Sequence, residues 1–149
     1  MIKEIKHILV PVDFSENSKS ILLSARFLAN KCQAKLSVVF VVQSIDDYSG
    51  FFVPHLPVAQ FEEELVEGAK RKMESFLREN TNAGDVAASA VLIGDVAEEV
   101  INHAREQGVD LIVMGTHGYK GLEKVLFGSV AEKVVKAASC PVLTINPYH

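Results

Sequence analysis

The stretch LSVVFVV, residues 36–42, consists almost wholly of apolar and mainly β-branched residues. A strand with one face in water alternates apolar and polar residues, whereas a strand buried on both faces is continuously apolar. The run HILVPV at residues 7–12 has the same continuous character. The two runs therefore predict strands of a mostly parallel sheet that helices cover on both faces.

Segments with helical spacing separate these two runs from three further short apolar runs. Strands that alternate with helices predict βαβ units, and such sheets bind ligands at the carboxyl ends of their strands, where the strand order switches direction. The third helix starts with a capping-box pattern, Asp95 and Glu98. The predicted strands are 7–12, 36–42, 86–93, 111–114 and 141–145, and the predicted helices are 15–32, 58–79, 95–108 and 129–138.

Length and composition restrict the class of protein. The 149 residues correspond to one domain, 1–149, and 48% hydrophobic with 23% charged residues is typical of a globular protein. No apolar run reaches the roughly 18–20 residues of a membrane span, and the N-terminus lacks the pattern of a signal peptide. A net charge of −4 argues against nucleic acid as a partner. We therefore expect a cytoplasmic protein, with Cys32 and Cys140 as reduced thiols.

Asp13 is the polar residue that follows the first predicted strand. No G-x-G-x-x-G pattern follows that strand, so the dinucleotide fingerprint is missing where it should occur. The carboxylate could accept a hydrogen bond from a ribose hydroxyl or an amino group. It could equally serve as a turn residue or helix cap, because aspartate is favoured in both.

The stretch GTHGYKG, residues 115–121, follows the fourth predicted strand, and Gly128-Ser129 opens the last predicted helix. Glycines let main-chain N–H groups approach an anion, and a helix N-terminus adds free N–H groups. These parts suit phosphate, although a surface loop with glycine turns explains them as well. His117 could be a base, a phosphate donor or a packing residue. The Walker-type P-loop pattern is absent from the chain.

The spacing of Gly115, Gly118, Gly128 and Ser129 is G-x-x-G-x9-G-S, which resembles the nucleotide signature of the universal stress protein family. The match continues through VAEKVV at 130–135 and CPVL at 140–143. ILVPVDFS at 8–15 and DLIVMG at 110–115 resemble the first and fourth strands of that family. The resemblance covers essentially the whole chain.

This resemblance implies an open five-stranded parallel sheet in the order 3-2-1-4-5, a Rossmann-like fold of the adenine nucleotide alpha hydrolase type. It also implies a homodimer through the last strand, 141–145, and binding of ATP. Asp13 is expected at the adenosine end, main-chain groups around Val41 at adenine, and the signature at ribose and phosphates. The nucleotide-binding residues implied in this way are Pro11, Val12, Asp13, Val41, Met114, Gly115, His117, Gly118, Lys120, Gly128, Ser129 and Val130.

One position departs from the family pattern. Many relatives carry a basic residue directly after the second glycine, where this chain has Tyr119, followed by Lys120. AMP or ADP is therefore an alternative to ATP, and Mg²⁺ or Mn²⁺ would be carried by the nucleotide itself. No catalytic residue and no protein metal site are expected. Three functions stay open: an ATP-binding regulator with slow or no hydrolysis, a nucleotide-independent scaffold, and a weak ATPase. The loop 43–57 is a candidate lid or dimer contact.

Overall fold

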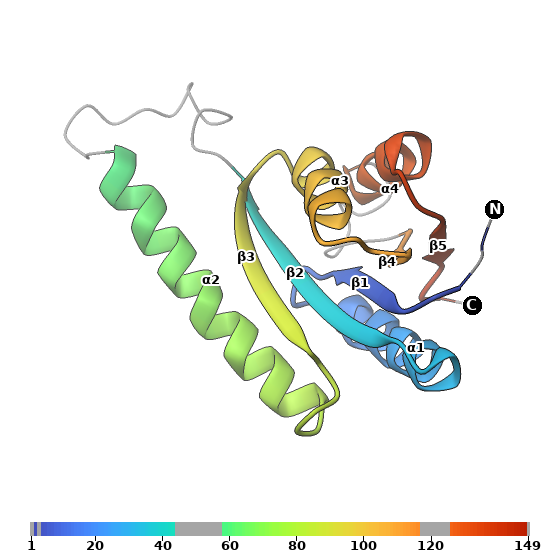
Figure 1. Cartoon of the computed structure of the whole chain (residues 1–149). Helices are drawn as coiled ribbons and strands as arrows, with labels where there is room; N and C mark the ends of the chain where they lie inside the picture. The colour runs from blue at the N-terminus through green and yellow to red at the C-terminus, as the bar shows by residue number, and fades with distance from the viewer. Residues whose placement is uncertain (1, 3, 44–57, 117–125, 149) are drawn as a thin grey trace.

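The computed structural model describes residues 2, 4–43, 58–116 and 126–148 (Figure 1). A five-stranded sheet, in the order β3-β2-β1-β4-β5, forms its centre, and each neighbouring pair of strands is parallel. This confirms the predicted fold class and strand order. The strands are β1 (His7–Pro11), β2 (Lys35–Gln43), β3 (Ala88–Gly94), β4 (Leu111–Gly115) and β5 (Val142–Ile145), and the helices are α1 (Glu16–Cys32), α2 (Val58–Asn80), α3 (Val96–Glu106) and α4 (Leu126–Ala137).

Helices cover both faces of the sheet, which explains why the central strands are apolar at consecutive positions. Ile8 and Val10 of β1 face a core cluster that includes residues of α1 and α2. Leu9, between them, faces a second cluster with residues of α3 and α4. All three side chains are fully buried. Successive side chains of a strand point to opposite faces, so a strand with two covered faces is apolar at consecutive positions.

The helix ends confirm some local predictions and correct others. Ser15 caps α1, and Asp95 caps α3 by accepting a hydrogen bond of 3.1 Å from the Glu98 amide. In the described part of the chain, the Glu98 side chain makes no return bond to Asp95, so the predicted capping box is half formed. Helix α4 begins at Leu126, not at Ser129. A glycine inside a helix costs about 1 kcal/mol relative to alanine, and burial of Ala131 and Val134 offsets such a cost.

The other boundaries lie within two residues of the prediction. Gly84 has a φ of +86° and separates α2 from β3 as predicted. Both cysteines are free, in agreement with the expected reduced thiols. None of the helices described combines the length and the apolar composition that a membrane crossing requires.

The strand order switches direction between β1 and β4. From the carboxyl end of β1 the chain enters α1 on one face of the sheet, whereas α4, which follows β4, lies on the other face (Figure 1). The residues directly after β1 and the first turn of α4 therefore flank the same edge of the sheet, which is where a parallel α/β sheet places its ligands.

Candidate functional site

Asp13 sits at this edge in a tight hydrogen-bonded turn. Its Oδ1 atom accepts hydrogen bonds from the Ser15 amide at 3.0 Å, the Ser15 hydroxyl at 2.5 Å and the Ser18 hydroxyl at 2.7 Å. The Asp13 amide donates to Ser18 Oγ at 2.8 Å. Oδ2 has no hydrogen-bond partner within the described ranges. The carboxylate thus acts as a turn residue through one oxygen and keeps a second oxygen for another donor.

Phe14, the next residue of this turn, anchors it to the core through its aromatic ring. Its φ of +66° lies in the left-handed region, which costs a non-glycine residue on the order of 1–3 kcal/mol. The ring packs against Phe40 of β2 at a centroid distance of 4.6 Å and against Phe76 of α2 at 5.6 Å. These contacts hold the residue in its strained conformation and tie the turn to two distant elements.

Sequence reasoning selected Asp13 but missed Ser18 and Phe14. The pattern Asp13-Phe14-Ser15 is typical of a turn in which a carboxylate accepts from the amide two residues later. That signal was available locally. The roles of Ser18 and Phe14 depend on contacts across a helix turn and across the core, which the local pattern does not specify.

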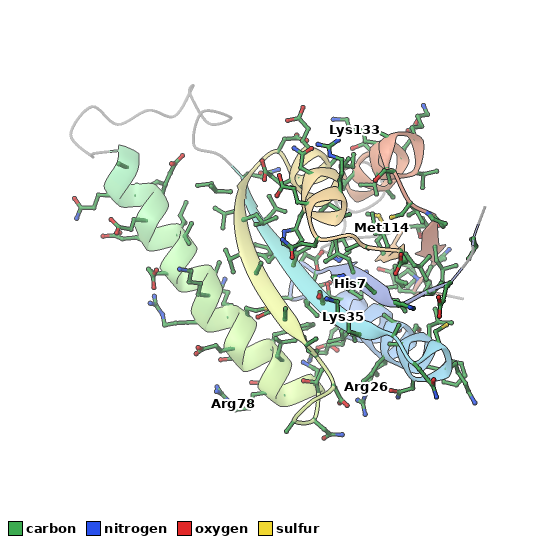
Figure 2. All side chains as sticks on the ribbon, viewed as in Figure 1. His7, Arg26, Lys35, Arg78, Met114 and Lys133 are labelled. Atoms are coloured by element: carbon green, nitrogen blue, oxygen red, sulfur yellow. The ribbon has the colours of Figure 1, made fainter. Side chains whose placement is uncertain are left out.

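Four predicted nucleotide-contact residues have buried positions in or next to the central strands: Val12, Val41, Met114 and Gly115. Met114 is fully buried in the core cluster of α3 and α4, and Figure 2 shows it beneath those helices. The Val12 amide donates to the Val39 carbonyl at 2.9 Å. A ligand could therefore meet these residues through main-chain groups, in the case of Val12 through its carbonyl. Pro11 is half-buried at the end of β1.

The first turn of α4 carries the second half of the signature. Gly128 is the third residue of this helix and Ser129, whose side chain is exposed, is the fourth. A β-carbon placed on Gly128 would have no heavy atom of the described residues within 4 Å. Val130 is the fifth residue of the helix, where an amide already has a partner within the helix. His117, Gly118 and Lys120 lie outside the described residues.

The opposite, amino-terminal edge of the sheet holds a buried histidine. His7 is 5% exposed; its Nε2 lies 2.7 Å from Ser37 Oγ and its Nδ1 lies 3.3 Å from the Gln107 carbonyl (Figure 2). Burial, and next the charge of Lys35, lower the pKa of His7. Burial raises the pKa of the Cys140 thiol, which makes that thiol less reactive. No cluster of potential metal ligands occurs within the described residues.

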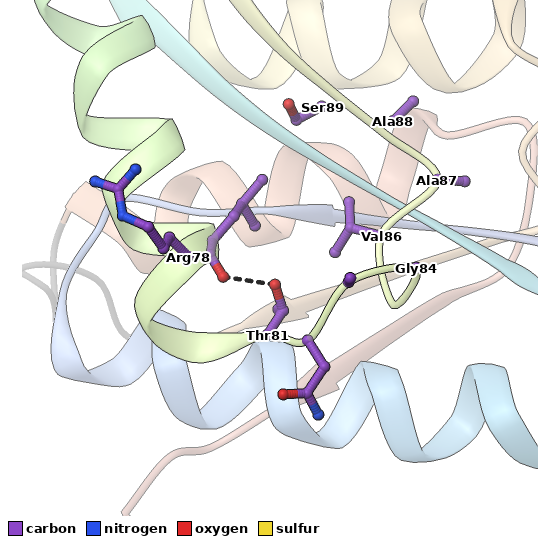
Figure 3. Close-up of a pocket in the computed structure, with 10 residues that line it drawn as sticks. Arg78, Thr81, Gly84, Val86, Ala87, Ala88 and Ser89 are labelled. Atoms are coloured by element: carbon purple, nitrogen blue, oxygen red, sulfur yellow. Dashed lines mark hydrogen bonds between the residues drawn. The ribbon is translucent and has the colours of Figure 1, made fainter.

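An open hollow of about 690 Å³ also lies at the amino-terminal edge, between the end of α2 and the start of β3 (Figure 3). Most of its lining is small, including Gly84, and the hydroxyl of Thr81, the residue after α2, donates to the Leu77 carbonyl of that helix. The charged lining residue Arg78 contacts Ser75 on the same helix at 3.3 Å. The hollow lies at the end of the sheet opposite to Asp13.

Comparison with known proteins gives matches along nearly the whole chain. A model of the universal stress protein family matches residues 4–146. Universal stress protein YxiE of Bacillus subtilis is 33% identical over 93% of this chain and 97% of that protein. Universal stress protein MJ0577 of Methanocaldococcus jannaschii is 32% identical over 95% of this chain and 94% of that protein.

Solved structures agree with these matches. The structure of MJ0577 superposes with a TM-score of 0.76 at 30% identity and covers 97% of both chains. A universal stress protein from Archaeoglobus fulgidus, in complex with dAMP, has a TM-score of 0.62 at 24% identity over 98% of this chain and 100% of that one. A universal stress protein in complex with cAMP has a TM-score of 0.61 at 19% identity, over 97% and 99%. The likeness to the latter two shows a shared fold.

Proposed function

We propose that this chain, which belongs to the universal stress protein family, binds an adenine nucleotide at the switch point between β1 and β4. The observation that carries the proposal is the Asp13 carboxylate. Ser15 and Ser18 donate hydrogen bonds to its Oδ1. None of the described residues donates to its Oδ2, so this oxygen can accept a hydrogen bond from a ligand. A carboxylate accepts hydrogen bonds and cannot donate them, so it matches a ribose hydroxyl or the adenine amino group.

The phosphate end of the ligand is assigned to the first turn of α4. Gly128 and Ser129 lie in the first turn of this helix, and the positive end of the helix dipole favours an anion there. The open space over Gly128 supports a close approach of phosphate to the main chain. The resemblance adds Gly115, Gly118 and Lys120, and Mg²⁺ or Mn²⁺ bound to the phosphates of the ligand.

The solved relatives support the class of ligand. Two solved universal stress proteins that share this fold are complexes with dAMP and cAMP, which have in common an adenine base and one phosphate. We take ATP as the ligand because the chain carries the full G-x-x-G-x9-G-S spacing, with ADP and AMP as the alternatives to compare.

The test is binding of ATP, ADP and AMP by calorimetry, together with mass spectrometry of any nucleotide that copurifies with the protein. Asp13→Asn replaces one acceptor oxygen by a donor group and should weaken ATP binding at least about tenfold, or about 1.4 kcal/mol. Asp95→Asn is the matched control, because Asp95 caps α3 after another strand of the same sheet. Wild-type protein that binds none of the three nucleotides would refute the proposal.

We further propose a cytoplasmic regulator that hydrolyses ATP slowly or not at all. Two free cysteines support a reducing compartment. Rapid phosphoryl transfer needs a positioned base, a metal anchor and a charge stabiliser, and Asp13, by resemblance, serves the adenosine end instead. Single-turnover hydrolysis measures this directly: a rate in the range of about 1–100 s⁻¹, usual for kinases, would contradict it.

The proposed homodimer uses strand β5, which pairs with β4 alone among the described strands. The Ile112 amide donates to the Pro141 carbonyl and the Thr116 amide to the Ile145 carbonyl. Because main-chain groups alternate along a strand, those of Val142 and Thr144 point to the open edge, where a second copy can pair with them. Thr144→Pro removes one outward donor and spares the bonds to β4. We expect dimers of wild-type protein and monomers of the variant in sedimentation; monomeric wild-type protein would oppose the assignment.

A further inference from the structure

Ser18 makes a two-way contact with Asp13. It lies in the first turn of α1 and is 7% exposed. Its oxygen accepts from the Asp13 amide at 2.8 Å, and its hydroxyl donates to Asp13 Oδ1 at 2.7 Å. A hydroxyl has a single proton, so donation to Oδ1 occupies its donor completely. The contact therefore joins the main chain and the side chain of Asp13 to the same buried oxygen.

Ser15 completes a closed ring of hydrogen bonds. Its hydroxyl donates to Asp13 Oδ1 and accepts from the Ser18 amide at 3.2 Å, which is the N-cap bond of α1. With the Ser15 amide, Oδ1 thus accepts from three protein donors. Oδ2 of the same carboxylate accepts from none of the described residues. The ring divides the two oxygens into one for the protein and one for another partner.

We propose that Ser18 is the positioning residue that holds Asp13 for ligand recognition, and that the site thereby selects ligands with a hydrogen-bond donor at the adenosine end. The inference rests on the proposed function. Hydrogen bonds hold Asp13 both at its main-chain amide and at Oδ1. The carboxylate therefore cannot rotate to present Oδ1 in place of Oδ2 to a ligand. Oδ2 can only accept a hydrogen bond. A ligand that has an acceptor or a C–H group opposite Oδ2 cannot form this hydrogen bond and leaves the oxygen without a partner.

Removal of the Ser18 hydroxyl takes away one of the three donors to Asp13 Oδ1 and leaves the Asp13 amide without its acceptor, so the carboxylate is held less firmly. We expect Ser18→Ala to lower the affinity for ATP about tenfold, as for the loss of one hydrogen bond to a charged group. Ser20→Ala is the matched control, because Ser20 lies on the same helix with an exposed side chain. This control should bind ATP as the wild-type protein does.

The discriminating measurement is the ratio of affinities between ATP and analogues that each lack one donor. ITP has an oxygen in place of the amino group, and 2′-deoxy-ATP and 3′-deoxy-ATP each lack one hydroxyl. The wild-type protein should bind one of the three clearly more weakly than ATP, and that analogue identifies the group facing Oδ2. In Ser18→Ala the same ratio should fall toward one. A general loss of stability would lower all affinities alike and leave the ratio unchanged.

The outcomes separate this inference from the proposed function. Failure of the wild-type protein to bind any adenine nucleotide sinks both. Normal ATP binding by Ser18→Ala, an equal loss for all analogues, or a wild-type protein that ignores all three donors sinks the inference alone. If Ser18→Ala fails to fold, Ser18→Cys keeps nearly the same volume with a much weaker donor, and the same loss of ratio is expected for it.

Discussion

Gly128 offers a direct test of whether the first turn of α4 is built for a ligand. It is the third residue of a regular helix, its φ is not positive, and an added β-carbon would meet no heavy atom of the described residues within 4 Å. Nothing described in the fold therefore requires glycine here. Glycine in a helix costs roughly 0.5–1 kcal/mol relative to alanine, so Gly128→Ala should stabilise the free protein by that amount.

In the presence of ATP, the wild-type protein should become more stable than Gly128→Ala. ATP at about 100 times its dissociation constant stabilises the wild-type protein by about 2.7 kcal/mol. If the methyl group weakens binding about tenfold, the same ATP concentration stabilises the variant by only about 1.4 kcal/mol. The wild-type protein should then be the more stable of the two by about 0.3–0.8 kcal/mol. Gly128→Val, with a bulkier side chain, should weaken ATP binding at least as strongly.

Urea unfolding with and without ATP measures both halves of this prediction. Gly68→Ala in α2 is the matched control, because its β-carbon would make an ordinary contact, 3.8 Å from the Arg71 side chain. It should raise stability to a similar degree in both conditions and leave affinity unchanged. If Gly128→Ala stabilises the protein and binds ATP normally, the placement of phosphate on this turn is wrong.

Two further predictions concern the turn and the buried histidine. Phe14→Ala removes the contacts with Phe40 and Phe76 and should lower stability by about 2 kcal/mol, whereas Phe27→Ala, at a residue 61% exposed, should change it by less than about 0.5 kcal/mol in the same denaturation experiment. The pKa of His7 is lowered in the folded protein, so as the pH falls the unfolded chain binds a proton at this histidine before the folded protein does. The contribution of neutral His7 to stability is therefore present above about pH 6.5 and is lost as the pH falls below that value. His7→Gln should flatten this part of the pH profile, and an unchanged slope between about pH 7 and pH 5 would contradict the assignment.

Hydrophobic periodicity predicted every strand and helix of the described chain because both faces of the sheet are covered. The run at 36–42 could be read as a strand without tertiary information, since a two-sided burial pattern is local. The strand order was different: it came from the family resemblance, because periodicity does not say which strands pair. Helix α4 begins before the predicted boundary at Gly128, because packing of Ala131 and Val134 stabilises a helix that includes this glycine.

Some features of the candidate site could likewise be predicted from the sequence, and others only from the tertiary structure. The sequence alone indicated that Asp13 follows a buried strand and that Gly128 and Ser129 lie near a helix N-terminus, since these are local facts of type and spacing. Only the tertiary structure decided that Oδ1 of Asp13 is occupied by Ser15 and Ser18 while Oδ2 is not, and that Phe14 is held in a left-handed conformation. The physical reason is that these features arise from directed hydrogen bonds and ring contacts between separate elements, and a directed contact exists only once the backbone has brought both partners into place.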